Sequence, residues 1–135
     1  MIVVDTSAIV AIALGEAERD AFVRAIESAG RALISTVSVV EARLVVHGRR
    51  GQRAVVLLDD LLRLPLFEWV APGIAETEAA YSAFVAFGRG SGHPASLNFG
   101  DVFSDALAKT RGLALLFKGD DFAETDIQNA LSPSD

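Results

Sequence analysis

Four short apolar segments, separated by longer stretches of helical periodicity, constrain the fold of this chain most strongly. The segments are 2–4, 32–35, 66–70 and 113–117, and proline or glycine residues flank the last two. Short strands that alternate with helices are typical of α/β proteins with parallel pairing. The sequence therefore predicts an α/β fold with a mostly parallel central sheet.

The stretches between these segments have the spacing of helices. Apolar residues recur at helical intervals in 21–26 and 79–87, and 39–46 and 55–62 are apolar enough to predict buried helices. A further helix is predicted over 100–110, with Asn98 as its N-cap and Gly112 at its end. The glycine-rich stretch 88–94 is predicted to be a loop inside the domain.

Length and composition favour one cytoplasmic domain spanning residues 1–135. A chain of 135 residues can bury a sizeable core, and its hydrophobic fraction of 51% argues against disorder. No apolar run approaches a membrane span, no signal-peptide pattern precedes the first strand, and there is no cysteine for disulfides or zinc. The net charge of −6 argues against a nucleic-acid binder, unless a bound metal reverses the sign locally.

Acidic residues stand where apolar structure begins or ends. Asp5 directly follows the first apolar segment, and Asp120 and Asp121 follow the last one. Because the carboxyl ends of parallel strands face one crevice, we expect these acids at a common rim. Glu41, in an apolar helical turn, and Asp101, in the first turn of a helix, can reach the same rim.

Four carboxylates in one crevice repel one another, and a divalent cation would remove that repulsion. Mg²⁺ and Mn²⁺ prefer oxygen ligands and commonly keep several waters. Such an ion would lower the pKa of a bound water and offset negative charge in the hydrolysis of a phosphodiester. The acids therefore predict metal-dependent phosphodiester chemistry without a nucleophilic side chain.

Each acid also has an ordinary structural interpretation. Asp5 can be the N-cap of a following helix, Glu41 a solvated helix residue, and Asp101 a partner of the helix dipole. Asp120 and Asp121 can be turn residues. The joint placement of the acids favours a site over these separate explanations.

Three further residues are interpreted as ordinary. Asp105, one turn after Asp101, is predicted to be a surface acid rather than an extra ligand. Trp69 lies in an apolar strand and is predicted to be core. His93 stands in the glycine-rich loop and is not needed as a general base.

The chain resembles the PIN-domain ribonucleases, and within them the VapC toxins of type II toxin–antitoxin pairs. The resemblance covers nearly the whole chain and rests on VVDTSAIVAI, STVSVVEARLVV and LNFGDVFSDALAKTRGLALLFKGDDFAETDI. It implies a three-layer α/β/α fold and a Mg²⁺- or Mn²⁺-dependent endoribonuclease. The four-acid site of the family carries over to Asp5, Glu41, Asp101, and Asp121 or its neighbour Asp120. The acid directly before the Phe fills the last place in many relatives, which favours Asp121.

One position departs from the family pattern. Relatives often end the last strand with Thr, where this chain has Phe117. Thr6 or Ser7 could provide the missing hydroxyl near Asp5.

The resemblance also implies partners. Toxins of this kind usually cut structured RNA, commonly tRNA or rRNA, usually dimerise, and are inhibited by a cognate VapB-like antitoxin. Part of the apolar stretches 39–46 and 55–62 could pack against an antitoxin helix or a second subunit, although plain core is the simpler interpretation.

Basic residues offer several possible contacts for an RNA phosphate, although a run of charge is usually only a solvated surface. The densest cluster lies at 49–53, with one more arginine before it, and two other basic residues flank the expected rim. These candidates are Arg43, Arg49, Arg50, Arg53, Arg89 and Lys118.

Two other functions compete with an RNase toxin. A phosphoacceptor signalling domain also clusters acids around Mg²⁺, but it needs two adjacent acids near the first strand and an acceptor Asp after a middle strand. Here the first strand supplies only Asp5, and the second ends in Ser35-Thr36. A non-catalytic interaction module with the same fold would be favoured by the loss of an acid, yet all four places are filled.

Overall fold

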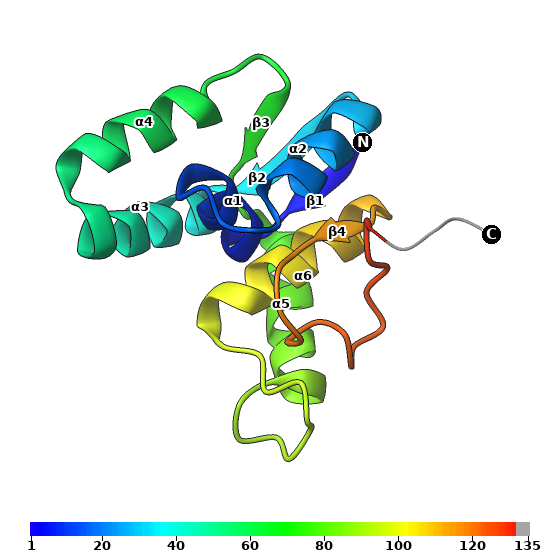
Figure 1. The fold of residues 1–135 in the computed structure, drawn as a ribbon. Helices are drawn as coiled ribbons and strands as arrows, with labels where there is room; N and C mark the ends of the chain where they lie inside the picture. Colours follow the sequence, from blue (N-terminus) through cyan, green and yellow to red (C-terminus); the bar gives the residue numbers. More distant parts are fainter. Residues whose placement is uncertain (132–135) are drawn as a thin grey trace.

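The central sheet of the computed structural model has four strands in the order β3-β2-β1-β4, and every neighbouring pair is parallel (Figure 1). The strands are β1 (Ile2–Val4), β2 (Ala32–Ser35), β3 (Phe67–Val70) and β4 (Leu115–Leu116). The structure describes residues 1–131. The predicted parallel α/β sheet is confirmed, and the last strand is shorter than the predicted 113–117.

Six helices join and cover the strands within the described part of the chain. They are α1 (Thr6–Ala13), α2 (Arg19–Ala29), α3 (Thr36–Arg50), α4 (Gln52–Leu62), α5 (Ile74–Phe87) and α6 (Phe99–Arg111). All five predicted helical stretches lie within these helices, and 88–94 is a loop as predicted. Asn98 caps α6, and Gly112 ends it with a φ of 65°, a left-handed conformation that favours glycine.

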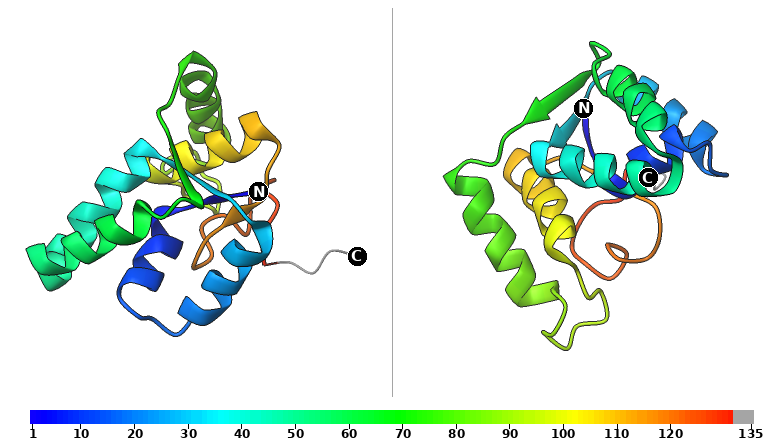
Figure 2. Two further views of the ribbon diagram at one scale, coloured as in Figure 1. Left: turned by 90° about the horizontal axis from the view of Figure 1, so that it is seen from above. Right: turned by 90° about the vertical axis from the view of Figure 1, so that its left-hand side faces the viewer.

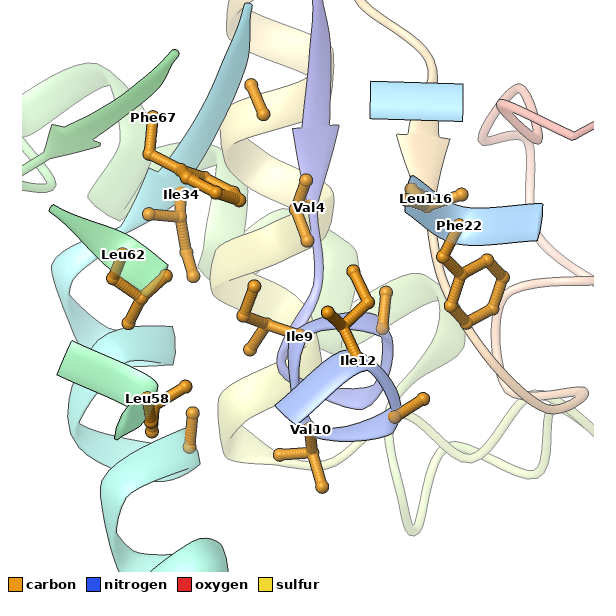
Figure 3. Close-up of a cluster of buried hydrophobic side chains, with 14 of the residues drawn as sticks. Val4, Ile9, Val10, Ile12, Phe22, Ile34, Leu58, Leu62, Phe67 and Leu116 are labelled. Atoms are coloured by element: carbon orange, nitrogen blue, oxygen red, sulfur yellow. The ribbon is translucent and has the colours of Figure 1, made fainter. Parts of the chain in front are cut away.

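The sheet separates two hydrophobic cores, so the layers are α/β/α as expected. Because side chains alternate along a strand, Val4 belongs to one core and Val3 to the other. Figure 3 shows the first core, where Ile9 of α1 and Leu58 of α4 lie near the sheet. The second core is formed with α5 and α6, which lie side by side on the opposite face (Figure 2).

The prediction that 39–46 and 55–62 form buried helices is only half right. Helices α3 and α4 pack against each other, and each buries one face, including Val46 and Leu58. The other faces expose apolar side chains: Leu44 is 68% exposed and Leu57 is 69% exposed. The apolar residues of these stretches are spread around each helix, so the sequence does not show which face is covered.

Trp69 is not core, contrary to the sequence prediction. β3 is an edge strand, and Trp69 is 37% exposed there. Its indole N–H donates to the Leu62 carbonyl at 2.9 Å, and the Arg43 guanidinium lies 5.5 Å from the ring centroid. The ring therefore packs at the surface with its polar atom satisfied, which is a common arrangement for Trp.

Asp105 is the second correction, because it is a buried acid rather than a surface one. It is 0% exposed, on the face of α6 that packs into the protein. Lys109, one turn later, lies 3.4 Å from its Oδ1. A single sequence does not reveal which face of α6 is covered, since α6 carries small and polar residues around much of its circumference.

None of the helices within residues 1–131 combines the length and the apolar character that a membrane crossing requires.

The topology places a crevice at the carboxyl end of β1. β1 pairs with β2 on one side and with β4 on the other. The chain passes from β1 to β2 and β3 on one side and then crosses back to β4 on the other, so the strand order reverses at β1. In open parallel sheets, sites form outside the carboxyl ends of strands at such a reversal. Residues that follow β1 and β4 are therefore brought to the same place.

Candidate active site

Asp5 occupies the carboxyl end of β1 and is only 2% exposed. Its Oδ2 accepts hydrogen bonds from the backbone N–H of Ser7 at 3.0 Å and from the Ser7 hydroxyl at 2.6 Å. Its Oδ1 accepts from the Ser104 hydroxyl at 2.6 Å. Asp5 is thus the N-cap of α1, as one interpretation held, and it also points toward α6. The two roles are compatible because one carboxylate has two oxygens.

Burial raises the pKa of Asp5 above its ordinary value, because a charged carboxylate loses its hydration inside the protein. The hydrogen bonds from Ser104 and Ser7 favour the charged form and offset part of this effect. Asp5 is therefore a buried carboxylate whose charged form is disfavoured by burial and favoured by three hydrogen-bond donors.

Glu41 lies on α3 and faces the same place from the other side of Asp5. The Thr6 hydroxyl donates to its Oε1 at 2.5 Å. Burial, and then the negative charge of Asp5, raise the pKa of Glu41. The carboxylate also lies against Gly100, where a Cβ atom would overlap it. Glycine at this position lets the start of α6 approach Glu41, so the interpretation of Glu41 as a solvated residue does not hold.

Asp101 stands in the first turn of α6 and forms a capping box with Asn98. Its backbone N–H donates to the Asn98 side-chain oxygen at 2.9 Å, and its Oδ2 accepts from the Asn98 backbone N–H at 3.0 Å. Burial raises the pKa of Asp101 to about 7, helped by the charges of Asp5, Asp121 and Glu41. Asp101 is therefore close enough to each of the other three carboxylates for their charges to disfavour its ionised form.

The four acids line one pocket of about 410 Å³. Asp121 reaches it from the loop after β4, whereas Asp120 is not among the described residues that line it. Asp121, but not Asp120, is also a source of the charge that raises the pKa of Asp101. The structure therefore brings together Asp5, Glu41, Asp101 and Asp121.

Both hydroxyls that could replace the absent strand-end Thr lie at this pocket. Phe117 is 6% exposed and belongs to the core. Thr6 donates to Glu41, while Ser7 donates to Asp5 and accepts the backbone N–H of Lys118 at 2.9 Å. Ser7 thus connects the end of β1 to the loop after β4.

Sequence reasoning missed two buried serines that support the acids. Ser104 is 1% exposed, and its hydroxyl lies 3.3 Å from that of Ser38, which is fully buried. Each serine stands three residues from an acid on its own helix: Ser38 before Glu41, and Ser104 after Asp101. That i, i+3 spacing puts serine and acid on one helix face and could have signalled the pair.

The basic candidates are only partly at the pocket. Arg49 and Lys118 line it, together with Glu16, which the sequence reasoning had not considered. The other four predicted phosphate contacts are not among its described lining residues, and Arg43 instead pairs with Asp59 at 2.8 Å.

The donor set fits a hard divalent cation. Carboxylate oxygens are the ligands that Mg²⁺ and Mn²⁺ prefer, and a cation would relieve the repulsion that raises the pKa of Asp101. In their present rotamers, no three acidic or histidine side chains of residues 1–131 converge closely enough to hold one ion. Asp5, Glu41 and Asp101 are turned instead to hydroxyl and backbone donors.

Comparisons with known proteins agree with this geometry. The PIN domain family model matches residues 2–128. The chain belongs to the PIN-domain family. Within it, the similarity is to VapC ribonucleases: Ribonuclease VapC28 of Mycobacterium tuberculosis is 42% identical over 96% of this chain and 97% of its own length. Ribonuclease VapC30 of the same species is 40% identical over 97% and 99%.

Solved structures of PIN-type toxins share the fold. The crystal structure of VapC20 from Mycobacterium tuberculosis, described as a Sarcin-Ricin loop cleaving toxin, has a TM-score of 0.76 at 21% identity and covers 94% of this chain and 96% of its own. VapBC2 from Rickettsia felis, bound to a DNA fragment from its promoter, has a TM-score of 0.75 at 15% identity over 96% of both chains. At these identities the likeness shows the fold alone.

Proposed function

We propose that this PIN-domain protein is the toxin of a type II toxin–antitoxin pair and that it hydrolyses RNA phosphodiester bonds with a divalent metal, Mg²⁺ or Mn²⁺. The single observation that carries the proposal is the pocket where Asp5, Glu41, Asp101 and Asp121 meet. Similarity to named VapC ribonucleases over almost the whole chain supports the same activity.

The metal-holding residues in this proposal are Asp5, Asp101, Glu41 and Asp121. A bound Mg²⁺ or Mn²⁺ would supply an activated water and offset the charge of the phosphate in the transition state. Ser104 and Ser7 hold the Asp5 carboxylate in one orientation through its two oxygens. Asn98 does the same for Asp101 through the capping box.

In this proposal, the affinity of the acids for a metal depends on their protonation. Because the pKa of Asp101 is raised to about 7, part of the protein carries a proton on Asp101 near neutral pH when no cation is bound. Binding of a cation would displace this proton, so metal affinity should rise with pH. Asp120 remains a weaker candidate for the fourth acid, because it stands next to Asp121 but outside the pocket lining.

The partners follow from the same proposal. We infer a VapB-like antitoxin as the inhibitor, a role supported by the likeness to toxin–antitoxin complexes from Rickettsia felis and Klebsiella pneumoniae. The substrate class is structured RNA, tRNA or rRNA, which places the protein in the cytoplasm. We further propose that residues 1–135 act as one domain and that the chain forms a homodimer.

The test is cleavage of total cellular RNA by the purified chain with Mg²⁺ or Mn²⁺, followed by mapping of the new 5′ ends. Asp5→Asn and Asp101→Asn should each lower the rate at least about a hundredfold, because each removes a charged metal ligand while keeping the shape of the side chain. Excess EDTA should abolish cleavage by the native chain.

A folded control is essential to that test. Both variants should keep the circular dichroism spectrum of the native chain, and Asp20→Asn, at an exposed position of α2, should cleave as the native chain does. Full activity in either pocket variant would refute the four-acid site. Absence of any cleavage by the native chain would favour a non-catalytic interaction module.

A further inference from the structure

Two basic side chains line the same pocket as the four acids, and both turn toward Glu16. Lys118 Nζ lies 3.1 Å from Glu16 Oε1, and Arg49 Nη1 lies 3.8 Å from Glu16 Oε2. Lys118 Nζ also lies 3.5 Å from Glu18 Oε2, but Glu18 is not among the described residues that line the pocket and does not pair with Arg49. Arg49 comes from the last turn of α3, and Lys118 follows β4. One carboxylate thus holds together two cations from distant parts of the chain.

The backbone of Lys118 is fixed relative to the acids. Its N–H donates to the Ser7 hydroxyl at 2.9 Å, and that hydroxyl donates to Asp5 Oδ2 at 2.6 Å. Two hydrogen bonds therefore link the backbone of Lys118 to the Asp5 carboxylate in the pocket. The point from which the Lys118 side chain extends is therefore fixed next to Asp5.

The contacts with Glu16 are accessible and easily exchanged. The side chains of Arg49 and Lys118 are 57% and 38% exposed, and that of Glu16 is 28% exposed. The distance of 3.8 Å between Arg49 and Glu16 is too long for a hydrogen bond. Exposed pairs of this kind add little to stability, so releasing them costs little.

We propose that Arg49 and Lys118 form a binding site for an RNA phosphate beside the acids, and that Glu16 occupies both cations until the phosphate replaces it. A phosphodiester has one negative charge and two free oxygens, as the Glu16 carboxylate does, so the exchange preserves the local balance of charge. Arginine offers a planar pair of donors to these oxygens, and lysine offers a compact charge. This inference rests on the proposed function, because it describes how that site holds its substrate.

The phosphate site explains why an acidic protein can bind RNA at an acidic pocket. The acids alone would repel a phosphate, and the two cations attract it to the position where the acids act. Because phosphate contacts release counterions, each one contributes to the salt dependence of RNA binding.

The experiment measures fluorescence anisotropy of a short, labelled single-stranded RNA with the full chain in EDTA, where metal-dependent cleavage cannot occur. Arg49→Gln and Lys118→Gln should each weaken binding about fivefold and reduce the slope of log affinity against log salt by about 0.7. Arg111→Gln is the matched control, because Arg111 ends α6, at the opposite end of that helix from Asp101. It should bind as the native chain does.

The role of Glu16 has its own variant. Glu16→Gln should tighten binding about threefold, since a competing anion is removed and both cations remain. Glu27→Gln removes one charge from an exposed position of α2 and should have a smaller effect. In a chain that also carries Arg49→Gln and Lys118→Gln, the effect of Glu16→Gln should fall to that of Glu27→Gln.

Two results would overturn the inference. One is that Arg49→Gln and Lys118→Gln bind like Arg111→Gln, and the other is that the native chain does not bind this RNA without metal. Metal-dependent cleavage that Asp101→Asn abolishes, together with the first result, would leave the nuclease standing and remove the phosphate site. If affinity depends on Arg49 and Lys118 but the chain cleaves no RNA, the phosphate site stands and the nuclease is refuted.

Discussion

Helix α6 carries two buried acids one turn apart, and the protein treats them differently. Asp105 is paired with Lys109, which also lies 3.0 Å from Asp126 and 5.3 Å from the centroid of the Phe87 ring. Asp101 has no such partner. None of the ion pairs among the described residues involves any of the four acids that line the pocket. A lysine one turn later on the same helix therefore neutralises Asp105, and no cation plays this part for Asp101 in the described residues.

The difference indicates that the pair of Asp105 and Lys109 and the four acids of the pocket have different roles. A cation supplied by Lys109 is permanent, so it suits a contact that holds α6 to the loop carrying Asp126. The cations at the pocket, Arg49 and Lys118, pair with Glu16 and leave the acids free. Acids left without a permanent cation can exchange a proton for a metal. Four predictions, which use six substitutions, would break or sharpen this comparison.

The largest effect is expected for Lys109→Met, which removes the permanent cation. It should lower the free energy of unfolding by about 3 kcal/mol at pH 7, because Asp105 would be left buried and unpaired. The loss should be smaller at pH 5, because burial already raises the pKa of Asp105 and a proton can then replace the lysine. Urea denaturation at the two pH values measures both quantities.

A double variant controls that prediction. Replacing both partners, Lys109→Met with Asp105→Leu, should restore most of the lost stability, since apolar residues of similar size can replace a buried ion pair. If Lys109→Met alone costs less than about 1 kcal/mol at pH 7, the pair is not a structural contact.

The second effect concerns the acid that has no permanent cation. Native Asp101 keeps its proton up to a pKa of about 7, whereas the unfolded chain releases it near the ordinary value of 3.8. Between these pH values the native state binds more protons than the unfolded state, so the stability of the metal-free protein should fall as pH rises from 4 to 7.

Asp101→Asn should remove much of that fall. In EDTA at pH 7 we expect it to raise the free energy of unfolding by about 2 kcal/mol, because the neutral amide ends the repulsion and can still accept from the Asn98 N–H. Thermal unfolding across this pH range, with and without Mg²⁺, is the measurement. Mg²⁺ should stabilise the native chain more than the variant, and equal stabilisation of both would contradict the proposed metal role of Asp101.

The third comparison separates the two neighbouring acids after β4. Asp121→Asn should slow RNA cleavage at least about tenfold, or about 1.4 kcal/mol in transition-state free energy, because Asp121 lines the pocket. Asp120→Asn makes the same chemical change next to it and should stay within about twofold. The opposite result would assign the fourth place to Asp120.

The smallest effect is expected for Asp126, the exposed one of the two acids that pair with Lys109. The Asp126 side chain is 61% exposed, so Asp126→Asn should change the free energy of unfolding by about 0.5 kcal/mol or less. A loss similar to that of Lys109→Met would mean that Asp126, rather than Asp105, is the partner that matters.

Local rules were sufficient for much of the fold. The strands, the parallel sheet and five of the six helices of the described chain could be predicted from the spacing of apolar residues and from boundary residues, such as Asn98 and Gly112 around α6. Asp5 and Asp101 were also predictable as candidates, since each occupies the end of an element. The resemblance to VapC toxins added the order of the acids along the chain.

Other features depend on contacts between segments far apart in sequence. Burial of Asp105, exposure of Trp69, the apolar outer faces of α3 and α4, and the presence of Arg49 rather than its neighbours at the pocket all follow from which faces meet. A single sequence contains no direct record of those contacts.

The sequence by itself determined that acids would stand at the ends of β1 and β4 and at the start of α6, because element boundaries are set by nearby residues. Only the tertiary structure decided which side chains those acids meet. Ser104 reaches Asp5 across 99 positions, and Lys118 reaches Glu16 across 102. The physical reason is that burial and electrostatic repulsion depend on distance in space, which packing of the two cores fixes and local propensity does not.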